Sequence, residues 1–304
     1  MRHFLFTTYL LTFTALGLLP AQARVLNIVT DIAPVRAIAQ SVSGSLQKPI
    51  QLIGAGVSAH DFALKPSDIR KLQQADLIIW LGPQATPGLA KLLRQEAFKG
   101  KALSLSDVAE TSALPLRKPG RFEDGLQADD MAPDPHQWLD PENGKVWAQA
   151  IAGAMRSLDP DNADIYAHQV TDLIVKIDEV TALVRTDFVQ ASPLPYLQYH
   201  DAFQYFEAAF SLSPLGAAAV EDEENTSLGT IAALRDLQSS FPISCVFVQN
   251  KQQEKRARAL LETSGVRVGY LDALGRDIPA EAYSYPALLT SIASGFAACL
   301  HSDR

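Results

Sequence analysis

The chain has 304 residues, a net charge of −8 and 47% hydrophobic residues, which is typical of a globular protein that buries a large core. The acidic balance argues against nucleic acid as the main partner, because nucleic-acid-binding proteins carry basic clusters. The densest basic stretch, Lys251–Arg258, also contains Glu254 and is typical of the solvated face of a helix. Length alone allows one large domain or two medium ones.

The N-terminus has the features of a secretory signal peptide. Arg2 gives a basic start, Phe4–Leu19 is an almost unbroken apolar run, and Ala21-Gln22-Ala23 matches the small-residue pattern that signal peptidase recognises. The apolar run is shorter than the roughly 20 residues needed to span a bilayer, which argues against the alternative of a retained anchor helix. We therefore expect residues 1–23 to be removed and the mature chain to begin at Arg24.

Short apolar strands alternate with helices in the first half of the chain. The pattern predicts strands at Leu26–Thr30, Pro49–Ile53 and Leu77–Leu81, and helices at Pro34–Val42 and at Ser67–Gln74, the second capped by Ser67. Such alternation predicts a parallel sheet covered on both faces, and ligands usually bind at the carboxyl ends of its strands. His60 follows the second strand, which suits a ligand position.

One long helix is predicted from Asp159 to about Gln190. Asp159 is a capping residue and Pro160 takes the first helical position. Apolar residues then recur at helical spacing: Ile165, Leu173, Ile177, Val180, Val184 and Phe188. At 1.5 Å per residue, this segment is on the order of 45 Å long.

A second α/β pattern follows the long helix. It predicts strands at Tyr196–Tyr199, Cys245–Val248 and Val266–Tyr270, and a terminal helix at Pro286–His301. We therefore predict an α/β fold with two parallel-sheet lobes joined by one long rigid helix. The N-terminal lobe is expected at residues 24–158, the linking helix at 159–190 and the C-terminal lobe at 191–304.

The chain has two cysteines, Cys245 in an apolar strand and Cys299 near the end of the terminal helix. An exported protein meets an oxidising compartment, in which an even pair favours a disulfide. Such a bridge would fix the terminal helix to the second sheet. The alternative is a pair of buried reduced cysteines.

Three histidines stand in distinctive phrases: His60 in AHDFALKPSD, His136 in DPHQWLDP and His200 in YHDAFQYFEAAF. Asp272 follows in GYLDALG. Three imidazoles and a carboxylate suit zinc and can fill a tetrahedral shell that leaves no position open for a reactant. This donor set predicts a site that holds a metal rather than one that uses it in catalysis.

The residues around these phrases are expected to have supporting roles. Asp61 and Asp201 each follow a candidate ligand and are candidates to orient an imidazole. Trp138 is expected to support His136, and the aromatic residues Phe203, Tyr205, Phe206 and Phe210 are expected to pack a helix behind the site. The remaining histidines, His3, His168 and His301, are expected to have no part in metal binding.

Taken together, the four phrases, the cysteine pair and the long central helix resemble the periplasmic zinc-binding proteins of ABC importers, the ZnuA-like branch of the helix-linked metal-binding family. The resemblance covers nearly the whole mature chain. It implies a monomer that captures zinc in the periplasm, in a cleft between the lobes, and delivers it to a membrane permease powered by a separate ATPase. The ligands implied are His60, His136 and His200, with Asp272 or a water molecule as the fourth.

The third ligand position indicates which metal is bound. In the manganese and iron branch of the family this position is a glutamate, whereas here it is His200. A third imidazole favours zinc, because nitrogen ligands suit zinc while manganese prefers oxygen.

The chain departs from the family pattern in three places. Many zinc-branch members have a glutamate where this chain has Ala59, and Gln249 lies in a Val-Gln-Asn stretch where Glu-Pro-Gln is usual. The segment Arg117–Ala132 is short and contains no histidine, although its family counterpart is often long and histidine-rich. Its four acidic residues, Glu123, Asp124, Asp129 and Asp130, predict a solvated loop rather than a second metal site.

Two other functions have to be weighed. A periplasmic zinc chaperone or buffer would have the same site, and only docking to a permease separates it from an importer component. A zinc hydrolase would need an open coordination position and a general base, for which Glu221–Glu224 offers carboxylates, but the chain has no HExxH motif. A Walker phosphate loop is also absent, so the chain is not itself the ATPase.

Overall fold

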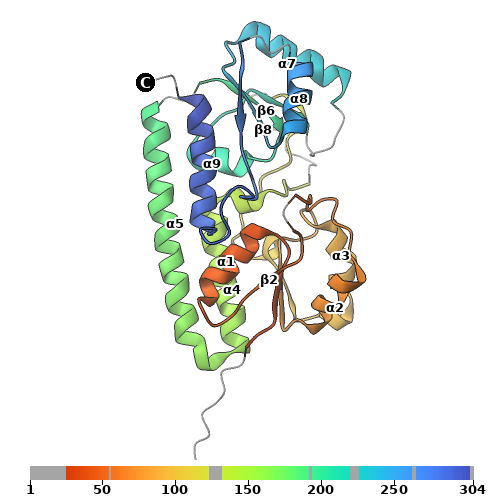
Figure 1. Ribbon diagram of the computed structural model, residues 1–304, viewed down its shortest axis with the longest axis vertical. Helices are drawn as coiled ribbons and strands as arrows, with labels where there is room; N and C mark the ends of the chain where they lie inside the picture. The colour runs from red at the N-terminus through yellow and green to blue at the C-terminus, as the bar shows by residue number, and fades with distance from the viewer. Residues whose placement is uncertain are drawn as a thin grey trace, which may run out of the picture.

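The computed structural model describes residues 25–54, 56–122, 132–191, 194–219, 226–261 and 265–301. The predicted signal peptide lies outside these residues. Figure 1 shows two α/β lobes stacked along one long helix, α5 (Ala163–Ala191), which runs beside both of them. The predicted two-lobed α/β fold with a linking helix is therefore confirmed. None of the helices in the described ranges has the length and apolar character needed to cross a membrane.

The first lobe contains a four-stranded parallel sheet in the order β2-β1-β3-β4. Its strands are β1 (Ile28–Thr30), β2 (Ile50–Gln51), β3 (Leu77–Trp80) and β4 (Ala102–Ser104). Helices α1 (Ala33–Ser43), α2 (Pro66–Gln74) and α3 (Pro87–Leu93) belong to the same lobe. Three of the strands and two of the helices were predicted, and the observed strands are shorter than predicted because only some of their residues pair in the sheet.

The start of α2 differs from its predicted start. The helix begins at Pro66, so Lys65 and not Ser67 is the capping residue. The backbone N–H of Lys65 donates to Asp68 Oδ2 at 3.1 Å. Proline at the first helical position removes a backbone donor that would have no partner there, which explains why the helix starts one residue earlier.

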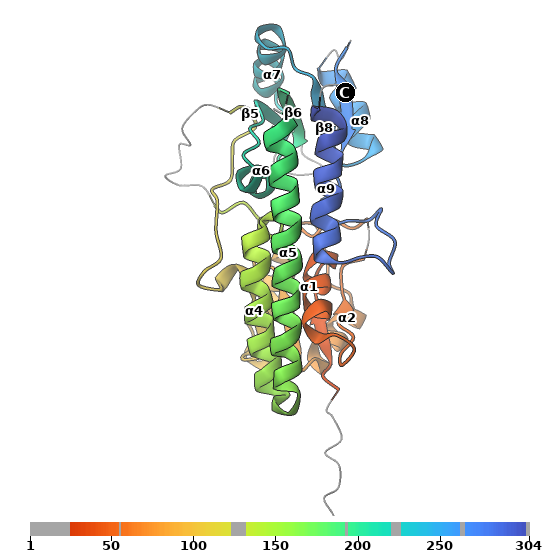
Figure 2. The ribbon, with the colours of Figure 1, turned by 90° about the vertical axis from the view of Figure 1, so that its left-hand side faces the viewer.

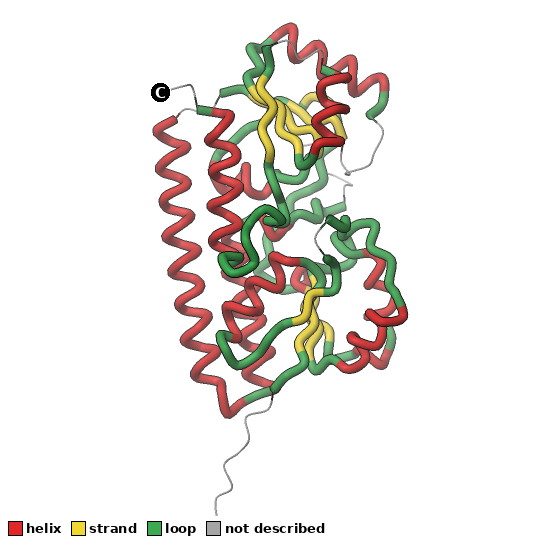
Figure 3. Tube along the Cα trace, in the orientation of Figure 1, coloured by secondary structure: helices red, strands yellow, loops and turns green. Residues whose placement is uncertain are grey.

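The second lobe contains a five-stranded sheet in the order β5-β7-β6-β8-β9. Its strands are β5 (Gly120–Arg121), β6 (Tyr196–His200), β7 (Gly216–Ala219), β8 (Cys245–Val248) and β9 (Arg267–Tyr270), and only β5 is antiparallel to its neighbour. Helices α6 (Gln204–Phe210), α7 (Leu228–Ser240) and α8 (Lys251–Leu260) complete the lobe. Figure 3 shows the two sheets one above the other, with helices around them.

Strand β5 was not predicted. It lies in the segment Arg117–Ala132, which was expected to be a solvated loop, and it pairs with β7 of the second lobe. The chain therefore passes from the first sheet to the second and returns before it reaches His136. The four acidic residues of this segment lie outside the described residues.

A layer of helices connects the lobes. Helices α4 (Pro141–Leu158) and α9 (Tyr285–Leu300) pack against α5, and α1 packs against both α4 and α5 (Figure 2). The described residues also form four short 3-10 turns: Glu96–Phe98, Leu105–Asp107, Gln137–Leu139 and Pro160–Asn162. The last of these turns explains why α5 begins at Ala163 rather than at Pro160.

The buried face of α5 largely follows the predicted stripe. Leu173, Ile177, Val184 and Phe188 are buried. Ile165 is 42% exposed, although it belongs to the predicted apolar stripe. Tyr166 is buried in its place, and its hydroxyl donates to Asp159 Oδ2 at 2.7 Å and accepts from Gln47 Nε2 at 3.1 Å. The tyrosine fills the core because its hydroxyl has polar partners there.

The cysteine pair forms the predicted bridge. Cys245 on β8 and Cys299 on α9 are joined by a disulfide across 54 residues of sequence. The aromatic residues predicted to pack behind the site, Phe203, Tyr205, Phe206 and Phe210, are all buried, and the Phe206 ring stacks on Phe296 of α9 with centroids 5.4 Å apart. Bridge and aromatic core together attach α9 to the second sheet.

Candidate metal site

Three imidazole rings from both lobes meet at the boundary between the lobes. The ring centroid of His136 lies 5.5 Å from that of His60 and 5.1 Å from that of His200. Two imidazoles that share a tetrahedral zinc have centroids about 5 Å apart, given zinc–nitrogen bonds of about 2.0 Å. His136 and His200 are buried and His60 is half-buried, so the rings form a largely enclosed group.

Each ring comes from a loop or strand end that faces the other lobe. His60 follows β2, in the loop before α2, and His200 is the last residue of β6. His136 directly precedes the 3-10 turn Gln137–Leu139. The ends of parallel strands gather side chains in this way, as the sequence pattern predicted.

A buried carboxylate and a tryptophan hold the His136 ring. Asp134 Oδ1 accepts hydrogen bonds from the backbone N–H of His136 and from its Nδ1, both at 2.8 Å. The Trp138 ring lies 5.2 Å from the imidazole. A proton on Nδ1 leaves the lone pair on Nε2, which is the arrangement found in many histidine ligands.

Gln249 holds the His200 ring. Its side-chain amide lies 3.0 Å from His200 Nδ1. The orientation of a glutamine amide follows from its hydrogen bonds. For His200 to bind a metal through Nε2, Nδ1 must carry the proton and Gln249 must present its oxygen. In the structure Gln249 Nε2 faces His200 Nδ1, and with the amide reversed Gln249 would have the role for His200 that Asp134 has for His136.

Asp272 accepts hydrogen bonds from its own turn. Its Oδ1 accepts from Leu274 N at 3.1 Å and from Arg276 Nε at 3.2 Å, and its Oδ2 accepts from Asp277 N at 3.2 Å. The next residue, Ala273, accepts a 2.7 Å hydrogen bond from Trp138 Nε1. This bond ties the Asp272 turn to the segment that carries His136.

The structure therefore brings the three histidines together and connects the turn that carries Asp272 to them only indirectly, through Trp138 and through Arg276 and Gln249. Within the described ranges, no three histidine, cysteine, aspartate or glutamate side chains are arranged to hold one ion. The distances between ring centroids suit zinc, while the imidazole nitrogens and the Asp272 oxygens do not converge on a common point.

The tyrosine at the start of α9 joins the lobes near the site. The buried hydroxyl of Tyr285 lies 2.8 Å from the carbonyl oxygen of Trp138 and 3.0 Å from that of Asp140. Burial raises the pKa of this phenol well above its usual value, so it stays protonated and can donate to these acceptors. The segment that carries His136 is thus fixed to the second lobe.

A buried charged cluster lies behind His200. Arg117 makes ion pairs with Asp201 and with Glu207, the second at 2.7 Å. Glu207 also accepts from Tyr196 at 3.0 Å and from Gln198 at 2.9 Å. Burial raises the pKa of both carboxyls, while the neighbouring guanidinium acts in the opposite direction.

The two aspartates that follow candidate ligand histidines do not orient imidazoles. Asp201 is directed to Arg117, and Asp61 is exposed. Asp134 and Gln249 do so instead, and the sequence analysis missed both as supporting residues. An aspartate two residues before a candidate ligand, as in DPH, was the available signal for the first. For Gln249, the sequence shows only that the residue differs from the family pattern, and its contact with His200 is seen only in the structure.

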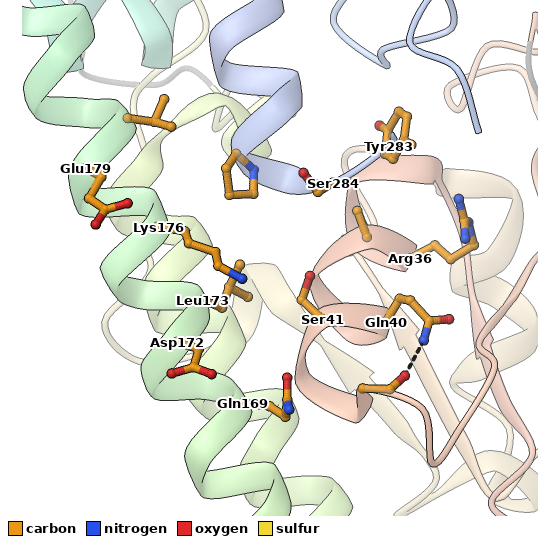
Figure 4. A pocket seen from close by; sticks show the side chains of 14 residues that line it. Arg36, Gln40, Ser41, Gln169, Asp172, Leu173, Lys176, Glu179, Tyr283 and Ser284 are labelled. Atoms are coloured by element: carbon orange, nitrogen blue, oxygen red, sulfur yellow. Dashed lines mark hydrogen bonds between the residues drawn. The ribbon is translucent and has the colours of Figure 1, made fainter. Parts of the chain in front are cut away.

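The remaining described histidines lie on or near the linking helix. His168 pairs with Asp172 at 3.2 Å, and His301 Nε2 lies 3.7 Å from Asp187. A separate hollow of about 430 Å³ lies between α1, α5 and the start of α9, where Lys176 reaches from α5 towards Ser41 of α1 (Figure 4). None of the four predicted ligands lines it.

Two α/β lobes joined by a long helix, with imidazoles from both lobes clustered at their boundary, define a two-lobed solute-binding protein of the helix-linked class. The family model described as ZnuA, the periplasmic component A of the zinc-uptake complex, matches residues 28–299. The chain therefore belongs to the ZnuA family.

Individual relatives agree with this assignment. The high-affinity zinc uptake system protein ZnuA of Paracoccus denitrificans is 31% identical over 94% of this chain and 95% of its own length. The protein of the same name from Brucella abortus is 26% identical over 90% of this chain and 91% of its own. Among solved structures, the periplasmic zinc-binding protein TroA of Treponema pallidum superposes with a TM-score of 0.76 at 19% identity, covering 90% of this chain and 99% of its own. That likeness concerns the fold alone.

Proposed function

We propose that this protein captures zinc between its two lobes and delivers it to an ABC-type membrane permease for high-affinity uptake. Membership of the ZnuA family supports this function, and the family is a solute-binding one, so the chain is not an enzyme. The observation that carries the proposal is the clustering of three imidazole rings from both lobes, with the His136 centroid 5.5 Å from that of His60 and 5.1 Å from that of His200. Zinc is the cargo, and it is released rather than kept.

The proposed ligands are His60, His136 and His200 through their Nε2 atoms, with Asp272 as the fourth. Asp134 and Gln249 support this assignment, because each engages the Nδ1 atom of a ligand and so directs its other nitrogen to the metal. Closure of the shell would require Asp272 to turn one oxygen towards the rings.

The lobes at 24–158 and 191–304 form the two walls of the site in this proposal, and the linking helix at 159–190 sets their spacing. A stiff helix packed against α4 and α9 favours small adjustments of the lobes over wide opening. The mature protein would work as a monomer in the periplasm, beside a permease driven by a separate ATPase.

The hydrolase alternative has little support. Its candidate general bases, Glu221–Glu224, lie outside the described residues. The four proposed ligands also leave no position for a reacting water, which a catalytic zinc needs.

A chaperone that hands zinc to other proteins would have the same site. The two functions separate in membrane vesicles that contain the cognate permease and ATPase, supplied with ATP on the side of the ATPase. The importer predicts that vesicles accumulate radioactive zinc only when this protein is present on the opposite side. Equal accumulation with and without it would contradict delivery to the permease, even if the protein binds zinc tightly.

A further inference from the structure

Arg276 contacts two residues of the proposed site. Its Nε donates to Asp272 Oδ1 at 3.2 Å, and its Nη2 donates to the carbonyl oxygen of Gln249 at 3.3 Å. Gln249 in turn contacts His200 at 3.0 Å. One guanidinium thus bridges the turn that carries the fourth proposed ligand and the residue that orients the third.

Arg276 also faces the first lobe. It lines two hollows, of about 290 and 140 Å³, and both are also lined by Val57 of the loop that leads to His60. Its side chain is 30% exposed, whereas that of Asp272 is 14% exposed. The guanidinium is therefore more exposed than the carboxylate with which it pairs, and it lies near the loop that leads to His60.

Asp272 does not depend on Arg276 for its position. The backbone N–H groups of Leu274 and Asp277 donate to its two oxygens at 3.1 and 3.2 Å. These two bonds hold the carboxylate in place if the guanidinium is removed. What Arg276 adds is therefore its positive charge, which pairs with an oxygen of the proposed fourth zinc ligand.

We propose that Arg276 is an exchange cation: it neutralises Asp272 when zinc is absent, must yield that carboxylate when zinc binds, and pairs with it again when zinc leaves. Zinc has to compete with the guanidinium for the Asp272 oxygen, which weakens binding and favours release. The arginine thus lowers the affinity of the site and speeds dissociation, which suits a protein that hands its cargo on. The inference rests on the proposed function, because it assumes that Asp272 ligates zinc.

The test compares zinc affinity, by competition with a chelating dye, and zinc dissociation, by stopped flow, in the wild type and in Arg276→Gln. The variant is expected to bind zinc about tenfold more tightly and to release it correspondingly more slowly, because a nearby positive charge is removed. Arg276→Lys keeps the charge and is expected to stay near the wild type. Arg258→Gln is the matched control, because it removes an arginine that pairs with Glu254 on α8, and it should leave both quantities unchanged.

A double-mutant cycle tests whether Arg276 changes the zinc affinity through Asp272. In the background of Asp272→Asn, Arg276→Gln should have little further effect if the guanidinium acts through that carboxylate. Equal or weaker zinc binding by Arg276→Gln, or a full effect in the Asp272→Asn background, would overturn the inference while the proposed function stood. Failure of the wild type to bind zinc would instead remove the proposed function and this inference with it.

Discussion

His136 Nδ1 lies 2.8 Å from Asp134 Oδ1, and both side chains are buried. The pair fixes which imidazole nitrogen is available to a metal, because the bonded nitrogen carries the proton. It also fixes the ring at the centre of the histidine group, between His60 and His200.

Replacement of Asp134 tests this role. Asp134→Ala removes the acceptor and is expected to weaken zinc binding by roughly 10- to 100-fold, the usual cost of losing a partner of a histidine ligand. Asp134→Asn keeps an acceptor oxygen and should lose less. Calorimetric titration with zinc measures both variants, and thermal unfolding without metal reports any damage to the fold. An affinity unchanged in Asp134→Ala would show that His136 does not depend on this carboxylate.

We expect the affinity for zinc to depend on which side-chain atom residue 249 presents to His200. Gln249→Leu removes the 3.0 Å contact to Nδ1 and is expected to weaken zinc binding by about tenfold. Gln249→Glu presents an acceptor in the same place and should bind zinc at least as tightly as the wild type. Gln252→Leu, an exposed change at the start of α8, is the matched control. Equal affinities for the Leu and Glu variants at position 249 would contradict this role.

Arg117 should contribute strongly to stability. Arg117→Gln leaves Asp201 and Glu207 buried without their cation, and breaking such a group typically costs about 3–5 kcal/mol. Urea unfolding of the metal-free protein measures the loss. Arg121→Gln, which alters an exposed arginine in the adjoining strand β5, should cost far less.

The same variant should show a defined pH dependence. Burial raises the pKa of Glu207 in the folded state, and loss of Arg117 raises it further. A carboxyl with a raised folded pKa favours folding below its unfolded pKa and opposes folding as the pH rises above that value. The stability deficit of Arg117→Gln should therefore be largest near pH 7 and shrink towards pH 5. A deficit that grew on acidification would contradict this account of the cluster.

The disulfide should support the fold without shaping the site. The double change Cys245→Ala and Cys299→Ala is expected to lower stability by about 4 kcal/mol on the chain-entropy estimate for a loop of this size. Zinc affinity at a temperature at which the variant stays folded should be unchanged. A loss of affinity larger than threefold would mean that the bridge also positions the metal ligands.

Much of the fold could be predicted from the sequence because its signals are local. Apolar runs predicted β1, β3, β6 and β8 within a residue or two, and the helical stripe predicted α5. Strand β5 could not be predicted, because two residues are too few to show a periodic pattern. Its pairing partner, β7, also lies about a hundred residues further along the sequence. The exposure of Ile165 also depends on tertiary contacts, since Tyr166 fills the core through hydrogen bonds to Gln47 and Asp159.

In the candidate site too, some residues could be predicted from the sequence and others could not. The phrases around His60, His136 and His200 predicted a group that the structure does bring together. The partner of His200 could not be found, because Gln249 lies 49 positions away in the sequence, whereas Asp134 lies only two residues before His136. Resemblance to a family indicates which residues are candidate ligands, while in our proposal this chain's own Arg276 and Gln249 determine how tightly they bind zinc.

The central claim is tested most directly by calorimetric titration of zinc into the metal-free mature protein, beside His60→Ala, His136→Ala, His200→Ala and Asp272→Ala. We expect one tight site in the wild type and a much weaker one in each histidine variant. Wild-type affinity should fall as the pH drops below about 6, because imidazoles must be neutral to bind zinc. Tight binding that survives loss of the histidines, or an affinity that stays flat from pH 7 to pH 5, would contradict the three-histidine site.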